Sequence, residues 1–359
     1  MKKQLLLLLM IPFLTACNPA VSESTNKESS TPQESTNVFD SYEESWFLYV
    51  EDIEINVGEV IEIDNVLDLD KYQVVIEDTS IAALDEKYLG GVKEGETSLY
   101  IIKDQEKQTV KLKVTSLGEY VDPYKFSELN LKDKKMVVFG DSVTAIATIG
   151  QANANLTYSA LFAKNFEMNL VKNYAIGGTT ATHTYFGSNI YKEYAGNKNV
   201  IDGCQVVQKA YKAKELNDID MAFIAYGHND QYFQPPVGAL NDRSYSFNSF
   251  ASCKSYKGSY RYMINTLRAA NPDMKIVLMN CTYSKYNEAN PSPYGSLYNY
   301  NDYREATKQI AIEMNCKYID PWDYMETYYD FGNGNVYYKD SVHISVAGHK
   351  VLADYLIKQ

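Results

Sequence analysis

Hydrophobic and polar positions follow three patterns along this chain. Residues 5–14 form one short apolar run, residues 45–116 alternate with a period of two, and strand-like and helix-like stretches follow one another from residue 131 onward. A period of two is typical of half-buried strands, and regular alternation of strands with helices is typical of α/β folds. The pattern therefore predicts a small β domain followed by a larger α/β domain.

The predicted β domain spans residues 45–117 and contains no helical stretch. Two of its strands carry an apolar residue at every second position: Ile53, Ile55 and Val57, then Val110, Leu112 and Val114. Several short strands of this kind predict a β-sandwich. Residues 78–82, followed by Gly91, Gly95 and Thr97, resemble the bacterial Ig-like domains of surface proteins. The resemblance implies a module that binds envelope or glycan. The favoured alternative is a spacer or a domain packed against its neighbour, because no exposed aromatic cluster stands out.

The predicted α/β domain spans residues 131–359 and follows a connector, residues 118–130, that contains Pro123. Its predicted strands are residues 135–139, 170–175, 221–226, 275–280 and 317–319. Its predicted helices are residues 158–166, 200–213, 259–270, 303–314 and 346–357. This order predicts a parallel sheet covered by helices on both faces.

The amino terminus has the layout of a secretion signal. Lys2 and Lys3 precede the apolar run, which is too short to span a membrane. Residues 14–17, Leu-Thr-Ala-Cys, resemble the lipobox of bacterial lipoproteins, which implies cleavage before Cys17 and a lipid on that residue. We therefore expect residues 1–17 to direct the chain out of the cytoplasm and to leave it anchored to the cell membrane through two or more acyl chains. The alternative is plain secretion with a free Cys17.

Residues 18–44 are rich in Ser, Thr, Glu, Asn and Gln and contain Pro19 and Pro32. Such a segment buries too little apolar surface to offset the entropy lost on ordering, so it predicts a flexible tether. The whole chain carries a net charge of −12. Because nucleic-acid binding needs a basic face, this charge argues against a nucleic-acid partner.

A short apolar strand ends in the sequence Gly140-Asp141-Ser142. Open parallel sheets bind their ligands at the carboxyl ends of the strands. We therefore interpret Ser142 as a candidate nucleophile. Gly, Asp and Ser also build ordinary turns, so this motif alone is weak evidence for chemistry.

Three further motifs follow predicted strands or lie near the carboxyl terminus. They are residues 173–180 (Asn-Tyr-Ala-Ile-Gly-Gly-Thr-Thr), 227–230 (Gly-His-Asn-Asp) and 340–343 (Asp-Ser-Val-His). Together with Ser142, and in this order, they resemble the four signature blocks of the SGNH hydrolases, also called GDSL esterases and lipases. The resemblance covers residues 131–359. It implies a flavodoxin-like three-layer α/β fold and the hydrolysis of carboxylic esters.

Ester cleavage requires an activated hydroxyl, a base, and donors for the oxyanion of the tetrahedral intermediate. The resemblance implies that Ser142 is the nucleophile, His343 the base and Asp340 the carboxylate that orients the imidazole. It also implies an oxyanion hole built from the backbone N–H groups of Ser142 and Gly178 and the side-chain amide of Asn229. The alternatives are a turn at Gly178, a helix cap at Asn229, and a loop salt pair between Asp340 and His343.

Other catalytic machinery is not found in the sequence. It contains no Gly-x-Ser-x-Gly, no His-Glu-x-x-His, no Cys-x-x-Cys and no glycine-rich phosphate loop. We therefore expect neither a metal ion nor a cofactor. Three histidines remain besides the predicted base. His183 is either solvated or close enough to touch a substrate, His228 occupies the variable position of its motif, and His349 packs or makes a surface contact.

The remaining cysteines are Cys204, Cys253, Cys281 and Cys316. Outside the cytoplasm, four cysteines permit disulfides in three connectivities. Because Cys281 ends one predicted strand and Cys316 precedes the next, we expect these two at opposite sheet edges. A bridge between Cys204 and Cys253 is then the favoured single disulfide, with buried free thiols as the alternative.

The segments after the third and fourth strands, residues 231–258 and 281–302, are long and aromatic, and such segments surround the ligand of a parallel sheet. Their aromatic residues are Tyr232, Phe233, Tyr245, Phe247, Phe250, Tyr256, Tyr283, Tyr286, Tyr294, Tyr298 and Tyr300. Rings among polar groups suit sugars, and the near absence of Leu and Ile argues against a deep acyl-chain tunnel.

The resulting hypothesis is a membrane-anchored serine esterase that removes small acyl groups, acetyl foremost, from a polysaccharide. A lipase or lysophospholipase that acts on membrane lipids is the first alternative. The second is a noncatalytic surface adhesin. Transfer of the acyl group to a sugar uses the same residues and stays open, as does the partner of the Ig-like domain.

Overall fold

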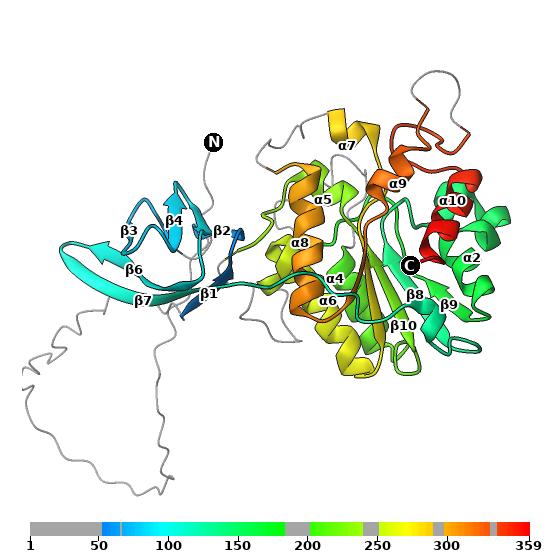
Figure 1. Cartoon of the computed structure of the whole chain (residues 1–359), viewed down its shortest axis with the longest axis horizontal. Helices are drawn as coiled ribbons and strands as arrows, with labels where there is room; N and C mark the ends of the chain where they lie inside the picture. Colours follow the sequence, from blue (N-terminus) through cyan, green and yellow to red (C-terminus); the bar gives the residue numbers. More distant parts are fainter. Residues whose placement is uncertain (1–51, 65–66, 184–201, 240–250, 290–297, 331–335) are drawn as a thin grey trace, which may run out of the picture. The chain divides into compact units, whose positions relative to one another are not determined.

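The computed structural model of the protein describes residues 52–64, 67–183, 202–239, 251–289, 298–330 and 336–359 (Figure 1). The predicted signal and lipobox, residues 1–17, and the predicted tether, residues 18–44, lie outside the described residues. All of the described residues belong to one compact unit, residues 49–359.

The amino-terminal strands form two sheets that fit an Ig-like sandwich, as the alternation predicts. Four strands pair in the order β1-β7-β6-β3 and three in the order β2-β5-β4. The strands are β1 (Ile53–Asn56), β2 (Val60–Glu62), β3 (Gln73–Ile76), β4 (Ala82–Asp85), β5 (Tyr88–Gly91), β6 (Gly95–Lys103) and β7 (Glu106–Thr115). Along β7, Val110, Leu112 and Val114 are buried while Lys111 and Lys113 are exposed. This period of two places one face of the strand in the core.

The α/β region contains a parallel sheet with the strand order β12-β11-β10-β8-β9 in the described chain. The strands are β8 (Lys135–Gly140), β9 (Asn169–Asn173), β10 (Met221–Ala225), β11 (Lys275–Met279) and β12 (Lys317–Ile319). Counted along the region, this is the 2-1-3-4-5 order of flavodoxin-like folds. The predicted fold class is thus confirmed.

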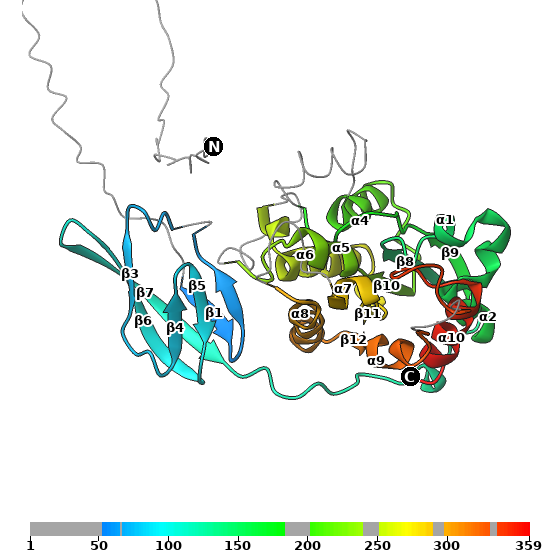
Figure 2. The same ribbon diagram turned by 90° about the horizontal axis from the view of Figure 1, so that it is seen from above.

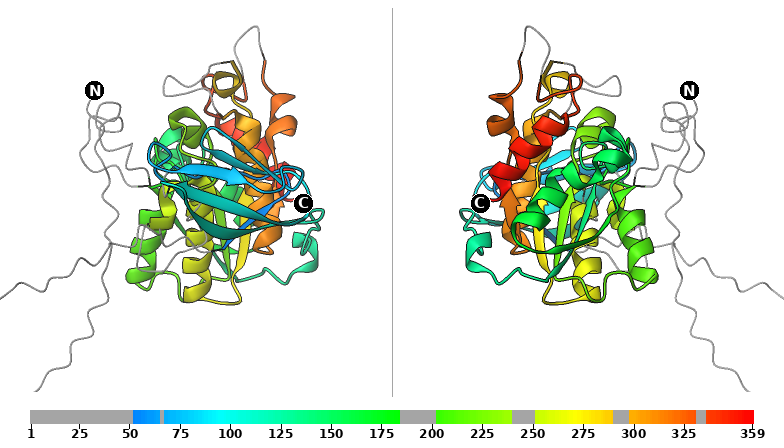
Figure 3. Two further views of the ribbon diagram at one scale, coloured as in Figure 1. Left: turned by 90° about the vertical axis from the view of Figure 1, so that its left-hand side faces the viewer. Right: turned by 90° about the vertical axis from the view of Figure 1, so that its right-hand side faces the viewer.

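Helices cover both faces of this sheet. The helices are α1 (Ile146–Ile149), α2 (Tyr158–Asn165), α4 (Gly203–Lys212), α5 (His228–Phe233), α6 (Tyr256–Ala270), α7 (Lys285–Ala289), α8 (Tyr300–Glu313), α9 (Trp322–Glu326) and α10 (Val346–Leu356), with 3-10 turns η1 (Phe126–Glu128), η2 (Gln151–Leu156) and η3 (Ala251–Lys254). Residues of α4, α6 and α8 pack with Val137 and Phe139 of β8, while residues of α2, α9 and α10 pack with Met136 and Val138. Figure 2 shows the strands between the two groups of helices, and the right-hand view of Figure 3 shows α10, in red, beside α2.

Some element ends differ from the prediction, and two of these differences have clear local reasons. β9 ends at Asn173 because the side chain of this residue accepts a hydrogen bond from the N–H of Ala175 at 2.9 Å and turns the chain away from the ladder. α6 begins at Tyr256 because the Ser255 hydroxyl accepts a hydrogen bond from the N–H of Gly258 at 3.0 Å and caps the helix. The short helices α1, α5, α7 and α9 were not predicted.

The favoured disulfide is wrong for this structure. Cys204, Cys253, Cys281 and Cys316 are all free thiols. Instead of forming a bridge, the Cys204 thiol donates to the carbonyls of Ala181 and Ser259, at 3.6 and 3.7 Å. Cys204 and Cys253 are fully buried, so both behave as small apolar core residues, which was the alternative prediction.

Candidate active site

The candidate site lies where the order of the parallel strands reverses. β8 and β10 are neighbours in the sheet, but β9 lies outside β8, and β11 and β12 lie outside β10. The connections after β8 and β10 therefore leave in opposite directions and open a crevice at the carboxyl ends of the two strands. Ser142 follows β8 and Asn229 follows β10, so both predicted site residues stand at this crevice.

A tight turn after β8 presents Ser142. The carboxylate of Asp141 accepts the N–H of Val143 at 3.0 Å, and its backbone carbonyl accepts the N–H of Ala145 at 3.0 Å. Gly140 permits this turn, because a Cβ atom there would lie 2.7 Å from the carbonyl oxygen of Ala225. Ser142 itself stays partly exposed at the tip of the turn.

A second tight loop, just before α10, presents the predicted base. Tyr338 and Ile344 form an isolated antiparallel bridge that closes the loop. Inside it, one carboxylate oxygen of Asp340 accepts the backbone N–H groups of Val342 and His343, at 2.8 and 2.7 Å. These two bonds hold the Asp340 carboxylate against the imidazole that follows it in sequence.

The structure brings Ser142, His343 and Asp340 into one hydrogen-bonded chain. Nε2 of His343 lies 2.9 Å from Oγ of Ser142, and Nδ1 of His343 lies 2.8 and 3.1 Å from the two carboxylate oxygens of Asp340. Partial burial acts to raise the pKa of Asp340, but the hydrogen bonds from the backbone and imidazole of His343 outweigh it, and the pKa lies below its ordinary value. Asp340 therefore faces the imidazole as a carboxylate.

The three residues predicted to form an oxyanion hole come from separate segments. The loop after β9 runs beside Ser142, since a Cβ atom on Gly177 would lie 3.6 Å from the Cβ of Ser142. Gly178 has φ of +79°, a conformation that favours glycine. Within the described part of the chain, the backbone N–H groups of Ser142 and Gly178 have no hydrogen-bond partner. The Asn229 amide donates one hydrogen to the carbonyl of Thr179 at 2.8 Å and has a second hydrogen to offer.

Asp230 ties the loop after β9 to helix α5, a role that the sequence analysis missed. One oxygen of its buried carboxylate accepts the N–H of Ala181 at 2.9 Å. The other accepts the hydroxyl and the N–H of Thr182, at 2.8 and 3.2 Å. Because Asn229 precedes Asp230 on α5, these bonds fix the amide of Asn229 relative to the loop that carries Gly178. The sequence did contain a signal for this role, since Asp230 is part of the motif formed by residues 227–230.

A second buried carboxyl group lies beneath Ser142. Asp141 is 1% exposed, and its second carboxylate oxygen has no hydrogen-bond partner in the described chain. Burial raises the pKa of Asp141 to about 7, and the nearby Asp230 adds to the effect. Burial likewise raises the pKa of Asp230 to about 6, although its hydrogen bonds oppose the change. Burial thus favours the protonated form of both carboxyl groups relative to an exposed aspartate.

The other three histidines lie outside the Ser142–His343–Asp340 chain. His228 is buried with Nδ1 3.2 Å from Oδ1 of Asn287, and burial lowers its pKa to about 4. His349 is buried and accepts the N–H of Tyr158 at 3.2 Å, and burial lowers its pKa to about 4 as well. His183 is only partly exposed, and its Nδ1 lies 2.6 Å from Oδ2 of Asp202. Contact between His183 and a substrate stays a prediction.

The predicted aromatic segments divide into core and surface. Tyr256 and Tyr283 are buried, and Tyr300 stacks on Trp322 with ring centroids 4.3 Å apart. Tyr256 and Tyr283 stabilise the α/β core, so their assignment to a substrate surface is wrong, while Tyr300 is partly buried and packs against the same core. Tyr256 was misassigned because α6 begins inside a segment that we predicted to be a loop, and Tyr283 because it packs against Trp322 from the segment just before α7. Tyr245, Phe247, Phe250 and Tyr294 lie outside the described residues.

Tyr232 and Tyr286 do lie near the candidate site. Their ring centroids are 5.8 Å apart at an interplanar angle of 41°. The backbone N–H of Tyr286 donates to the carbonyl of Ser341, between Asp340 and His343, at 3.3 Å. Both side chains are only partly buried. The segment after β11 therefore touches the loop that carries His343 through the backbone of Tyr286, and Tyr232, from the segment after β10, packs on the ring of Tyr286.

No group of three or more His, Cys, Asp or Glu side chains that could hold a metal ion occurs among the residues that the structure describes. Nor does any helix in those residues have both the length and the apolar character that a membrane crossing requires.

The GDSL-like Lipase/Acylhydrolase family model matches residues 138–351. This match covers more than half of the chain, so the chain belongs to that family. The family and the fold define the α/β region as an SGNH hydrolase, and the protein is a carboxylic ester hydrolase. No curated protein in the comparison matches the chain.

Several solved structures resemble part of the chain. A protein from Lactobacillus plantarum is 16% identical, and the match covers 63% of this chain and 95% of that one with a TM-score of 0.42. A carbohydrate acetylesterase family member from Sinorhizobium meliloti is 13% identical, and the match covers 62% of this chain and 95% of that one with a TM-score of 0.41. A variant of an acetyl-xylooligosaccharide esterase from Geobacillus is 21% identical, and the match covers 64% of this chain and 97% of that one with a TM-score of 0.38.

Proposed function

We propose that Ser142, His343 and Asp340 form the catalytic triad of this ester hydrolase. The 2.9 Å contact between Nε2 of His343 and Oγ of Ser142 carries the proposal. His343 takes the hydroxyl proton as Ser142 Oγ attacks the acyl carbon, and it returns that proton to the departing alcohol. A water molecule activated by the same imidazole then cleaves the acyl-enzyme and releases the acid.

The oxyanion of each tetrahedral intermediate is held by the N–H groups of Ser142 and Gly178 and by the Asn229 amide. Three observations support this part of the proposal. The two backbone donors have no protein partner within the described chain, the Asn229 amide has a hydrogen to spare, and Asp230 fixes the segments that carry Gly178 and Asn229. Donors that are already in position need no reorganisation when charge develops on the oxygen.

We propose further that the substrate is a carbohydrate carrying small acyl esters, acetyl foremost. The paired rings of Tyr232 and Tyr286, the second of which bonds the His343 loop through its backbone, support this choice, because partly exposed tyrosines bind the apolar faces of sugar rings and hydrogen-bond their hydroxyls. The scarcity of Leu and Ile in residues 231–258 and 281–302 leaves little side-chain surface to enclose a long acyl chain.

We also propose that the protein acts outside the cytoplasm as a lipoprotein anchored through Cys17, with residues 18–44 as a tether, residues 45–117 as a bacterial Ig-like domain and residues 131–359 as the hydrolase domain. Residues 14–17 and the apolar run before them support the anchor. Replacing Cys17 by Ser should release the full-length protein from the membrane fraction. Equal retention of both forms would overturn the lipid anchor.

Acetate release from a panel of acetylated glycans tests the proposed activity. The wild-type protein should release acetate, and Ser142→Ala should release none above background. A series of p-nitrophenyl esters adds the acyl-length profile, which should fall from acetyl to longer chains. A preference for acyl chains of eight carbons or more would instead identify a lipase.

A further inference from the structure

A buried ion pair joins the Ig-like sandwich to the α/β region. The Glu59 carboxylate, after β1, lies 2.8 Å from the ammonium group of Lys257 on α6, and both side chains are almost fully buried. Lys257 also donates to the side-chain carbonyl of Gln309 on α8 at 2.6 Å. Beside this pair, the backbone N–H of Glu62 donates to the carbonyl of Gly238 at 3.0 Å. Directed contacts therefore fix the two surfaces that face each other here.

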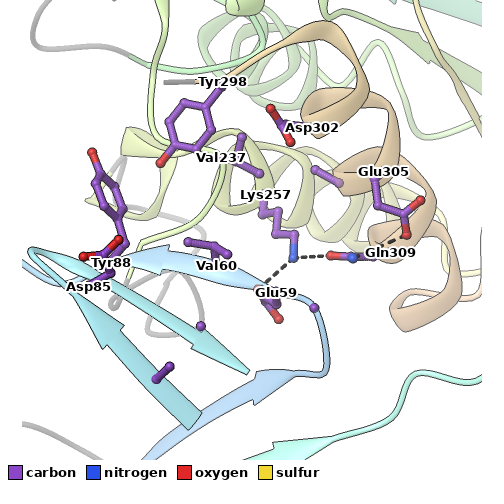
Figure 4. Close-up of a pocket in the computed structure, with 14 residues that line it drawn as sticks. Glu59, Val60, Asp85, Tyr88, Val237, Lys257, Tyr298, Asp302, Glu305 and Gln309 are labelled. Atoms are coloured by element: carbon purple, nitrogen blue, oxygen red, sulfur yellow. Dashed lines mark hydrogen bonds and ion pairs between the residues drawn. The ribbon is translucent and has the colours of Figure 1, made fainter. Parts of the chain in front are cut away.

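A cavity of about 410 Å³ lies between these surfaces (Figure 4). Its volume falls within the range of roughly 300–1,000 Å³ that is typical of small-molecule sites. Val60 of β2 and Ala306 of α8 give it apolar surface, and Val60 is 44% exposed in the absence of a ligand. The cavity is thus open enough to admit a ligand and apolar enough to retain one.

The charges that line the cavity are strongly unbalanced. Lys257 is the one basic residue among the lining residues, and its charge is matched by that of Glu59. Three more carboxylates line the cavity: Asp85, Asp302 and Glu305. None of these three makes an ion pair with a Lys, Arg or His in the described part of the chain. The lining therefore favours a cation and repels an anion.

Two tyrosines complete the cavity. Figure 4 shows Tyr88 from the Ig-like sandwich and Tyr298 from the α/β region on the same side of it. The Tyr298 hydroxyl is buried beside the backbone of Val237, another residue that lines the cavity. Tyrosine rings bind both the apolar faces of sugars and ammonium groups.

We propose that this cavity is a second binding site, which takes a sugar unit carrying a free, protonated amine. Asp85, Asp302 and Glu305 hold the ammonium group and the hydroxyls, while Tyr88 and Tyr298 contact the ring. The site draws residues from both regions, so the Ig-like sandwich contributes directly to ligand binding and is more than a spacer. The proposal goes beyond ester hydrolysis and does not depend on Ser142.

Calorimetric titration of the full chain with a glucosamine hexamer, at about pH 6 where the amines are protonated, tests the proposal. The hexamer should bind, more weakly as salt is raised, and an N-acetylglucosamine hexamer should bind at least about tenfold more weakly. Ser142→Ala should bind both oligomers like the wild type, so a failure of the esterase proposal would leave this result unchanged.

The variants Asp85→Asn and Glu305→Gln locate the site. Each should weaken glucosamine binding several-fold while the circular dichroism spectrum stays unchanged, and Asp273→Asn, an exposed carboxylate elsewhere, should have no effect. Asp302 is left intact because it caps α8. Equal affinity for the two hexamers would overturn the proposed recognition of a free amine. No binding of the glucosamine hexamer, or unchanged binding in both cavity variants, would overturn the proposed binding site.

Discussion

The carboxylate of Glu59 and the ammonium group of Lys257 lie 2.8 Å apart with only 3% and 2% of their side chains exposed. Asn56 supports the carboxylate, donating its backbone N–H at 2.9 Å and its side-chain amide at 2.7 Å. Burial alone would raise the pKa of Glu59, but Lys257 and Arg261 outweigh it and lower the pKa to about 2. The pair thus joins the two regions as ionised groups.

Glu59→Gln should destabilise the protein by about 3–5 kcal/mol near neutral pH, because it leaves Lys257 buried without its counter-charge. The folded pKa lies below the ordinary value of 4.5, so the stabilisation is complete above about pH 4.5 and is lost as the pH falls toward 2. Urea unfolding at several pH values measures both effects. The matched control is Glu96→Gln, which breaks an exposed pair with Lys111 and should cost under about 1 kcal/mol. Equal losses of unfolding free energy in Glu59→Gln and Glu96→Gln would contradict the role assigned to Glu59.

Asp340→Asn should lower kcat for p-nitrophenyl acetate by about 10²–10⁴-fold. The amide can still accept a hydrogen bond from the N–H of Val342, so the loop should keep its shape. However, the amide cannot stabilise the imidazolium that forms at His343 during attack. Circular dichroism should be unchanged, and Asp273→Asn is the control. Activity within threefold of wild type would rule out Asp340 as the orienting group.

Substitutions at two adjacent residues of α5 distinguish hydrogen-bond donation to the oxyanion from positioning of the donor groups. Asn229→Ala should lower kcat by about 10²–10³-fold, because it removes one donor to the oxyanion. Asp230→Asn should also lower kcat with little change in KM, because an amide has one acceptor oxygen and cannot receive Ala181 and Thr182 on two oxygens as the carboxylate does. Thr182→Val removes only the hydroxyl contact and should have the smaller effect. A rise in KM without loss of kcat in Asp230→Asn would place its effect in substrate binding.

Asp141 should make the folded state less stable as the pH rises. Its pKa is about 7 when folded, against an ordinary 3.8, so the folded protein retains a proton that the unfolded chain releases between about pH 4 and pH 7. Asp141→Asn removes this dependence. The stability of the variant relative to wild type should therefore increase over that range, by roughly 4 kcal/mol at most. Denaturant unfolding at several pH values measures the difference, and a constant difference would contradict the buried protonated carboxyl.

The sequence predicted those features that repeat along the chain. Alternation at Val110, Leu112 and Val114 gave the sandwich, and strand-helix alternation gave the parallel sheet. Its strand 317–319 was predicted with the bounds found in β12. The predicted start of α8 was three residues late, because Asn299 and Asp302 form a capping box at positions that we assigned to a loop.

Long-range pairing was harder to predict. The four motifs indicated which residues would meet, but nothing in the spacing of Asp230 and Thr182 indicates that they bond. The contact between Glu59 and Lys257 also depends on how the two regions pack against each other. Amino-acid composition does not predict that packing. The tyrosines show the same limit, since Tyr283 in the core and Tyr286 beside the site lie three positions apart in the same segment.

Reaction with a fluorophosphonate, followed by peptide mass mapping, tests the central claim most directly. The claim is that the imidazole of His343 activates the hydroxyl of Ser142, 201 positions earlier in the chain. The wild-type protein should carry one adduct, on Ser142, Ser142→Ala should carry none, and His343→Gln should react far more slowly. No adduct on the wild type, or equal labelling of the Ser142→Ala variant, would contradict the account and leave a noncatalytic surface protein in its place.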